Sequence, residues 1–453
     1  MTREDEDSPS VDDPALFGSR RRFLKTAAAV VVAPSIIPAS ALGADGSTPP
    51  SERVAMGCIG VGGQGSGDMW AFANDPRVQV VAVCDVDAAR RDAAQKGIDA
   101  HYARRAPSGA CKGCVATTDF RDVLLRRDID AVMIGTPDHW HAIISIEAMR
   151  SGKDVYCEKP LSYTVVEGRA IADAERRYGR VLQTGTQRRS MAPFRHTCEL
   201  VRNGRIGRLH TVRVGLPRGF AIRLGNFEGD QKPQTVPAGF DYDLWLGPAP
   251  DAPYTPGRCH FNFRWILDYG EGYISDWGAH YMDVAQWGQG ADRSGPVRVG
   301  AWAKFPATGL YDAPTDFRIE YMYADGVRTI CSTEETLGMR FEGDEGWIHA
   351  EKPGATGVVA EPASVLDSTI GPSEIRLPES PGHHANFIDC VLSRRETVAP
   401  AEIGHRSAAV CHIGCIAAIL GRELEWDPEG ERFVGDAEAN RMLSRPMRGE
   451  WHL

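Results

Sequence analysis

Residues 53–85 read RVAMGCIGVGGQGSGDMWAFANDPRVQVVAVCD. Their pattern predicts a strand from Arg53 to Gly60, a glycine-rich turn, a helix from Ser66 to Asn74 and a second strand from Val78 to Cys84. The second strand ends at an acid, Asp85. This order of strand, glycine turn, helix, strand and terminal acid is typical of a dinucleotide-binding βαβ unit, and it is more specific than the glycines alone.

The glycines of the turn have separate expected roles. Gly60 permits a tight turn, Gly62 lets the main chain approach a pyrophosphate, and Gly65 lets the helix pack close to its strand. Gly63 and Gln64 complete the turn at the helix N-terminus, where unpaired N–H groups attract phosphate. The alternative is an ordinary glycine-rich turn in an α/β domain, which the complete βαβ context argues against.

Asp85 bears on the choice of cofactor. At the end of the second strand, its carboxylate would accept hydrogen bonds from the ribose hydroxyls of an adenosine and would repel an additional 2′-phosphate. The sequence therefore predicts NAD, with NADP disfavoured.

Two later strands end in polar clusters. The strand Ala131 to Gly135 is followed by TPDHWH at 136–141, and the strand Asp154 to Cys157 is followed by EKP at 158–160. Ligands of open parallel sheets bind outside the carboxyl ends of the strands. Cofactor contacts are expected from Thr136, Pro137, His141, Glu158 and Lys159.

The second half of the chain supplies a further polar pair. In a helical pattern between Gly270 and Gly290, Asp276 and His280 are four residues apart, which places them on one helix face. Such a pair could be an ordinary surface pair or two metal ligands, but no third ligand is evident and no metal is expected. Trp277 beside them could pack in a core or against the apolar face of a pyranose.

These motifs together resemble the Gfo/Idh/MocA family, which includes glucose-fructose oxidoreductase and inositol dehydrogenase. The resemblance extends from about Arg53 to the C-terminus, and it implies NAD(P) binding and chemistry at a hydroxyl of a sugar or cyclitol. It also implies that Lys159 is the catalytic lysine and that Asp276 and His280 are the Asp-x-x-x-His pair of the inositol dehydrogenase branch.

Elementary chemistry agrees with these roles. Pro160 disfavours helix at Lys159, so the lysine should project from a strand end, where a partly buried ammonium beside a nicotinamide can move a proton. His280 can take the proton of a hydroxyl, and Asp276 can orient the imidazole or bind another hydroxyl. The alternative for Lys159 is the usual solvent-exposed position of a lysine.

Substrate contacts are expected from Gln187, Arg264 and Trp277, which lie in polar-aromatic clusters. A structural salt bridge or loop hydrogen bond is an equally good interpretation of the first two. The insert Gly215 to Pro256, rich in glycine, proline and aromatic residues, is predicted to form a long loop over the site.

The length of 453 residues suggests two or three domains. A Rossmann domain is expected at 52–175. The resemblance implies that a C-terminal domain at 176–453 follows, built on a large open mixed or antiparallel sheet, so the expected fold class is α/β plus α+β. Asp316 to Thr333 reads as a hairpin with a tight turn at Asp325-Gly326. An exposed sheet face favours self-association into a dimer or tetramer.

Residues 1–44 read as a twin-arginine export signal. Ser19-Arg20-Arg21-Arg22-Phe23-Leu24-Lys25 precedes an apolar stretch, and small residues at 39–41 offer a cleavage site. An uncleaved anchor helix is the alternative. The signal predicts a periplasmic protein that is exported already folded and has no membrane contact in its mature form.

The net charge bears on the binding partners of the protein, and the cysteine content bears on its disulfides and metal sites. Lys and Arg number 51 against 61 Asp and Glu, a formal charge of −10, so nucleic acid is not an expected partner. Eleven cysteines cannot all be paired, and most lie in apolar patterns. Cys111 and Cys114 could form a local disulfide, a redox pair or half of a zinc site.

The sequence thus predicts an exported NAD-dependent oxidoreductase that acts on a CH–OH group of a sugar, glycoside or cyclitol and holds its cofactor tightly, since a periplasm offers no free NAD pool. Two alternatives remain open. One is a glycoside hydrolase that transiently oxidises its sugar, and the other is a non-catalytic module that binds NAD and sugar.

Overall fold

The computed structural model describes residues 52–105, 113–221, 232–351 and 357–453. Residues 53–453 form one compact unit. The predicted signal and Cys111 lie outside the described residues, so the proposed Cys111–Cys114 bond does as well.

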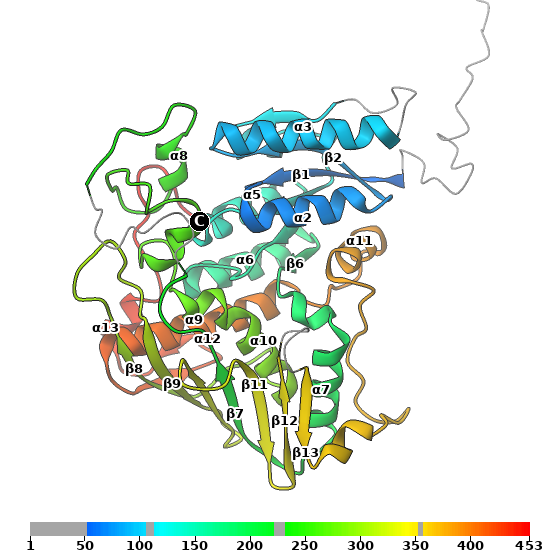
Figure 1. Cartoon of the computed structure of the whole chain (residues 1–453), viewed down its shortest axis with the longest axis vertical. Coiled ribbons are helices and arrows are strands. Elements are labelled where there is room, and N and C mark those ends of the chain that lie inside the picture. Colours follow the sequence, from blue (N-terminus) through cyan, green and yellow to red (C-terminus); the bar gives the residue numbers. More distant parts are fainter. Residues whose placement is uncertain (1–51, 106–112, 222–231, 352–356) are drawn as a thin grey trace, which may run out of the picture. The chain divides into compact units, whose positions relative to one another are not determined.

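The first sheet is the predicted Rossmann-like parallel sheet, with strand order β3-β2-β1-β4-β5-β6 (Figure 1). Its central strands are largely apolar and buried on both faces, as expected when helices cover both sides of a parallel sheet, whereas the edge strand β3 is partly exposed. The strands are β1 (Val54–Ile59), β2 (Val78–Cys84), β3 (Val115–Thr117), β4 (Ala131–Ile134), β5 (Asp154–Cys157) and β6 (Leu182–Thr184). The connecting helices are α2 (Gly63–Asn74), α3 (Ala88–Arg105), α4 (Phe120–Leu124), α5 (His141–Arg150) and α6 (Val165–Tyr178).

Two boundaries differ from those expected. Helix α2 begins at Gly63 rather than Ser66, because Gly63 adopts a left-handed φ of +47° that closes the turn directly into the helix. The parallel sheet continues past residue 175, since β6 pairs with β5 through Val155–Leu182 and its neighbours.

The second sheet has nine strands in the order β13-β12-β11-β7-β10-β9-β8-β14-β15. It is mixed, because β7 pairs with β10 in parallel while its other pairings are antiparallel. The strands are β7 (Leu209–Gly215), β8 (Arg298–Lys304), β9 (Asp316–Met322), β10 (Arg328–Ser332), β11 (Gly338–Gly343), β12 (Gly346–Ala350), β13 (Val358–Glu361), β14 (Leu424–Asp427) and β15 (Arg432–Phe433).

The predicted hairpin is confirmed as β9–β10, but its turn is longer than expected. Met322 pairs with Arg328, so five residues form the loop, and Tyr323 donates its N–H to the Val327 carbonyl at 2.9 Å. The chain ends with β14, β15 and the helix α13 (Ala437–Arg441).

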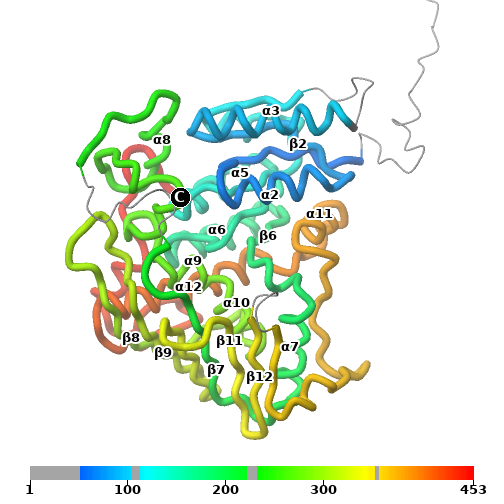
Figure 2. The backbone as a smooth tube through the Cα atoms, in the orientation of Figure 1, coloured from blue at the N-terminus to red at the C-terminus, as the bar shows by residue number. Residues whose placement is uncertain are grey.

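Helices join the two sheets (Figure 2). Helix α12 contacts α6 on one side and β8 and β9 on the other, so it belongs to both cores. It is long and apolar enough to cross a membrane, but 83% of its most apolar window is buried within the protein, as in a core helix. The remaining helices are α7 (Ala192–Arg202), α8 (Tyr242–Leu246), α9 (Tyr273–Asp276), α10 (Gly278–Gln289), α11 (His383–Ser393) and α12 (Ala401–Leu420).

Candidate active site

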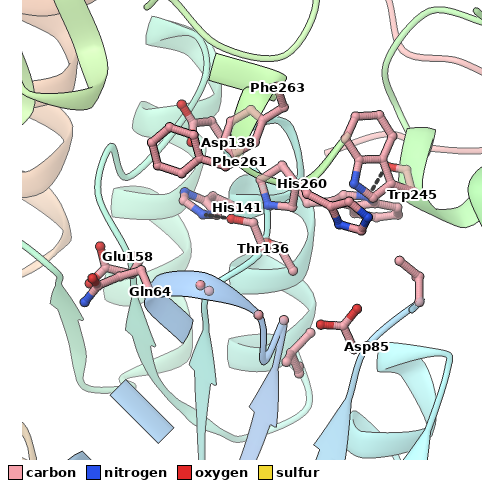
Figure 3. Close-up of a pocket in the computed structure, with 18 of the residues that line it drawn as sticks. Gln64, Asp85, Thr136, Asp138, His141, Glu158, Trp245, His260, Phe261 and Phe263 are labelled. Carbon is pink, nitrogen blue, oxygen red and sulfur yellow. Dashed lines mark hydrogen bonds between the residues drawn. The ribbon is translucent and has the colours of Figure 1, made fainter. Parts of the chain in front are cut away.

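A cavity of about 670 Å³ lies at the carboxyl ends of β1, β2, β4 and β5 (Figure 3). Its wall combines the glycine turn of the first sheet with side chains from residues 240–280 of the second domain. All the predicted site residues line it except Gly65: Gly60, Gly62, Gly63, Gln64, Asp85, Thr136, Pro137, His141, Glu158, Lys159, Gln187, Arg264, Asp276, Trp277 and His280.

The glycine turn is shaped by close backbone packing. Gly60 has a φ of +78°, and a Cβ there would lie 2.7 Å from the backbone of Gly135 and Thr136. A Cβ on Gly65 would lie 2.0 Å from the Gly60 carbonyl oxygen. Gly65 therefore acts behind the cavity, by letting α2 pack closely against β1, while Gly63 faces open space.

Asp85 is fixed beneath this turn. One carboxylate oxygen accepts the Val61 N–H at 3.0 Å and the other accepts the Asp87 N–H at 2.9 Å. Burial raises the pKa of Asp85, although these backbone bonds and the nearby Arg90 oppose the increase. The carboxylate is thus held in one orientation at the end of β2, where sequence reasoning placed it.

His141 connects the two polar clusters of the first sheet. Its Nδ1 lies 2.7 Å from the Pro160 carbonyl oxygen and its Nε2 lies 2.9 Å from the Thr136 carbonyl oxygen. Burial lowers the pKa of His141, but the neighbouring Cys157 and the two carbonyl oxygens outweigh it, so the pKa is raised. His141, predicted to contact a cofactor, lines the cavity, and its ring nitrogens also hold the β4 turn to the loop that carries Lys159.

Lys159, Asp276 and Arg264 form a buried ionic cluster at the other end of the cavity. The Lys159 Nζ donates to the Asp276 carboxylate and to its backbone carbonyl, both at 2.7 Å, and the Arg264 Nε donates to the same carboxylate oxygen at 3.1 Å. Burial raises the pKa of Asp276, but the two cations prevail and hold it well below its usual range. Asp276 therefore positions the lysine.

The single helix predicted around Asp276 and His280 is interrupted at Trp277, where α9 ends and α10 begins. Asp276 and His280 still line the same cavity. Asp283, three residues after His280 in α10, does not line the cavity: its carboxylate accepts hydrogen bonds from Arg189 at 2.8 Å and Ser407 at 2.8 Å.

Glu158 lies between the two ends of the cavity. It is buried, and its carboxylate accepts a hydrogen bond from Gln187 at 3.2 Å. Burial and the neighbouring Asp68 raise the pKa of Glu158 well above its usual value. Asp68 in turn contacts His384 at 2.9 Å.

Arg264 is both a salt-bridge partner of Asp276 and part of the cavity wall. Its guanidinium carbon lies 4.5 Å from the centre of the Phe261 ring and 4.7 Å from that of Phe263. These cation–π contacts fix the side chain with Asp276 at one side. Trp277 is half-buried in the same wall.

Sequence reasoning missed three parts of the wall. One is Asp138, in the same TPDHWH motif, and a second is Arg90, which lies against Gly62 and 3.5 Å from the Asp87 carboxylate. The third is the aromatic part of a segment that we call the strap, residues 239–263, which contributes Phe240, Trp245, His260, Phe261 and Phe263. The predicted loop over the site includes Phe240 and Trp245, and the polar-aromatic cluster that contains Arg264 includes the other three, but none of the five was chosen as a site residue.

Both halves of the chain match known protein families. Residues 54–186 match the family described as "Oxidoreductase family, NAD-binding Rossmann fold", and residues 191–453 match the "Oxidoreductase family, C-terminal alpha/beta domain". The chain belongs to the Gfo/Idh/MocA oxidoreductase family.

Among its curated relatives in this family is "Glycosyl hydrolase family 109 protein 2" of Shewanella sp. (strain ANA-3), 36% identical over 165 residues, which are 33% of this chain and 35% of that protein. "Inositol 2-dehydrogenase" of Salmonella agona (strain SL483) is 32% identical over 153 residues, or 33% of this chain and 42% of that protein. The chain thus spans less than half the length of these relatives.

Solved structures of the same fold include the WlbA dehydrogenase of Bordetella pertussis in complex with NADH and UDP-GlcNAcA. It has a TM-score of 0.59 and 17% sequence identity, over 83% of this chain and 99% of that one. At this identity the likeness shows a shared fold.

The residues present in this family member fit a nicotinamide dinucleotide. The turn at Gly63 leaves an open cradle, the Asp85 carboxylate is fixed at the end of β2, and the buried Thr136 Oγ1 has no hydrogen-bond partner among the described residues. Within the same described ranges, no group of three or more His, Cys, Asp or Glu side chains is placed to hold a metal ion.

Proposed function

We propose that the protein is an NAD-dependent oxidoreductase that oxidises or reduces a hydroxyl of a sugar, glycoside or cyclitol. The observation that carries this proposal is the ammonium of Lys159, held by Asp276 in the same cavity as the glycine turn. Relatives named inositol 2-dehydrogenase, and a solved levoglucosan dehydrogenase of the same fold, support the substrate class.

In this proposal a bound nicotinamide supplies a hydride acceptor or donor. The chain's own residues handle the proton: in the reducing direction the Lys159 ammonium gives a proton to the carbonyl oxygen as the carbon receives its hydride. In the oxidising direction the neutral amine of Lys159, with His280 in the same cavity wall, takes the hydroxyl proton while the carbon gives up its hydride. Asp276 keeps the ammonium oriented, and Arg264 limits the negative charge that Asp276 presents to the substrate.

Asp85 favours NAD over NADP because its carboxylate is buried and fixed by two backbone N–H groups. Arg90 lines the same cavity, and its guanidinium is 3.5 Å from the Asp87 carboxylate. The positive charge of Arg90, which would attract a 2′-phosphate, is therefore partly neutralised by Asp87.

The strap supports the proposal that the cofactor is tightly held. Two backbone hydrogen bonds attach it to the end of the β2–α3 connection: Ala88 donates to Gly239 and Asp241 donates to Val86, both at 2.9 Å. The Trp140 Nε1 donates to strap carbonyl oxygens at 3.1 Å. A nucleotide beside Asp85 would be covered by Phe240 and His260.

Export to the periplasm stays a prediction from residues 19–41, and it motivates cofactor retention. Self-association also stays a prediction; Trp302, 60% exposed on β8, lies on the sheet that would mediate it.

The second candidate function is redox-assisted glycoside hydrolysis, which the relatives named glycosyl hydrolase family 109 proteins favour. One assay separates it from a simple dehydrogenase. With methyl β-D-glucoside, myo-inositol or 4-nitrophenyl β-D-glucoside, a dehydrogenase produces NADH in proportion to sugar and added NAD. The hydrolase instead releases nitrophenol from 4-nitrophenyl β-D-glucoside with no net production of NADH.

Cofactor retention has its own measurement. Purified protein is denatured and the released nucleotide is quantified, and about one NAD per chain is expected. Protein that is consistently empty and does not bind added NAD contradicts the proposed function. A non-catalytic module would instead bind NAD and sugar without turnover, and Lys159→Ala would leave both affinities unchanged.

A further inference from the structure

Asp138 is a carboxyl group in the cavity wall that the roles described above leave unused. It follows Pro137 at the carboxyl end of β4 and begins a short 3-10 turn, Asp138–Trp140. Its side chain lines the cavity and is 6% exposed. Figure 3 shows it with Phe261 and Phe263 on the same side of the site.

The turn that carries Asp138 is held in place by the strap. The His139 Nε2 lies 3.0 Å from the Trp245 carbonyl oxygen, and the Trp140 Nε1 donates to the same oxygen at 3.1 Å. Because both following side chains are anchored there, the Asp138 carboxyl is fixed in the wall.

Asp138 differs from the other carboxylates of the cavity in its hydrogen bonding. Asp85 accepts two backbone N–H groups, Glu158 accepts from Gln187, and Asp276 accepts from Lys159 and Arg264. Within the part of the chain that the structure describes, no donor is bonded to the Asp138 carboxyl. Buried polar groups normally have partners, so an unbonded carboxyl facing a cavity indicates a partner that arrives with a ligand.

The charged groups around Asp138 are Arg264, Lys159, Asp276 and Glu271. Burial raises the pKa of Asp138 to about 7; Arg264 and Lys159 lower it, and Asp276 and Glu271 raise it. Since both cations are already bonded to Asp276, they leave Asp138 without an ion-pair partner. Asp138 therefore carries a proton below about pH 7 and a negative charge above it.

We propose that Asp138 contacts the substrate directly and determines specificity by hydrogen-bonding a carbohydrate hydroxyl beside the one that reacts at Lys159. This inference rests on the proposed function. A protonated carboxyl can donate one hydrogen bond and accept another, which matches a pair of neighbouring ring hydroxyls. The ionised form can only accept, and it adds a third negative charge beside Asp276 and Glu271. Substrate binding should therefore weaken as the pH rises through 7.

The test compares Asp138→Asn and Asp138→Leu with the wild-type holoenzyme. The probes are methyl β-D-glucoside, myo-inositol and 4-nitrophenyl β-D-glucoside, each measured for binding by calorimetry and for turnover at pH 6 and pH 8. We expect wild-type Kd and KM to rise about tenfold between these pH values. In Asp138→Asn, which does not titrate, that rise disappears.

Asp138→Leu should raise Kd and KM about 10–100-fold at both pH values and change kcat less, because it removes the polar partner of a substrate hydroxyl. NAD affinity and melting temperature serve as checks that the fold and cofactor site are intact. Asp344→Leu, at a turn position whose side chain is 53% exposed, is the matched control and should behave as wild type.

The outcomes separate the two proposals. If Asp138→Leu binds and converts the probes as wild type does, the role of Asp138 is overturned and the proposed function stands. If wild type binds a probe in an Asp138-dependent way without turnover, the proposed function fails and the role of Asp138 stands. If no probe binds wild-type holoenzyme, both fail.

Discussion

The two ends of the cavity are built in different ways. The end at Asp85 is made by the backbone of one continuous stretch of chain. Three glycines shape the turn, and two backbone N–H groups hold the single carboxylate of Asp85. The end at Lys159 is made by charged side chains that are more than 100 residues apart in sequence. The first end therefore depends on space between main chains, and the second depends on a balance of buried charges.

The largest expected effect concerns the backbone end. In Gly65→Ala the new Cβ would lie 2.0 Å from the Gly60 carbonyl oxygen, so α2 must move away from β1. We expect the free energy of unfolding to fall by about 3 kcal/mol and NAD binding to be lost. Chemical denaturation and calorimetric titration with NAD measure the two effects.

Gly67→Ala is the matched control, because a Cβ at this position on the same helix meets no atom within 4 Å. It should stabilise the protein slightly, by about 0.5–1 kcal/mol, since alanine favours helix. Equal effects of the two substitutions on stability and NAD binding would show that the close packing of α2 against β1 at Gly65 is not required at the Asp85 end of the cavity.

The next effect concerns the charged end. Lys159→Met removes the group proposed to move the proton, and kcat should fall about 10²–10⁴-fold while NAD still binds. Steady-state kinetics and NAD titration measure this, with Lys304→Met at an exposed position of β8 as the control. A variant that keeps wild-type kcat would remove Lys159 from the mechanism.

A smaller effect tests the basis of cofactor choice. Asp85→Ser keeps a hydrogen-bonding group but removes the charge that repels a 2′-phosphate, while the Arg90 cation remains in the cavity wall. The ratio of NADP affinity to NAD affinity should rise about 10–100-fold. An unchanged ratio in nucleotide titrations would mean that Asp85 does not select the cofactor.

The smallest effect concerns the strap. Arg448 donates to the Gly247 carbonyl oxygen at 3.0 Å and to the Asp243 carboxylate at 2.6 Å, which ties the C-terminal tail to the strap. Because these bonds are partly exposed, Arg448→Ala should raise the rate of NAD release only about 2–5-fold. Stopped-flow displacement of NADH measures it, and an unaltered rate would separate the tail from cofactor retention.

The comparison also explains which residues sequence reasoning reached. Gly60, Gly65 and Asp85 could be assigned individual roles because strand, turn, helix and strand follow one another without interruption. The break between α9 and α10 at Trp277 was not foreseen, because the helical pattern runs through it without interruption. Asp138 was overlooked although its motif was recognised. What distinguishes it is that no described residue donates a hydrogen bond to its carboxyl, and only the folded structure shows this.

The sequence by itself determined the family, the parallel sheet and the order of the motifs along it, because local periodicity and short-range turns specify them. Only the tertiary structure decided that Asp276 holds Lys159, that His141 joins two loops, and that the strap reaches Asp138 and the β2 end. Those pairings form between segments distant in the chain, and their strength depends on burial, which no local pattern of residues encodes.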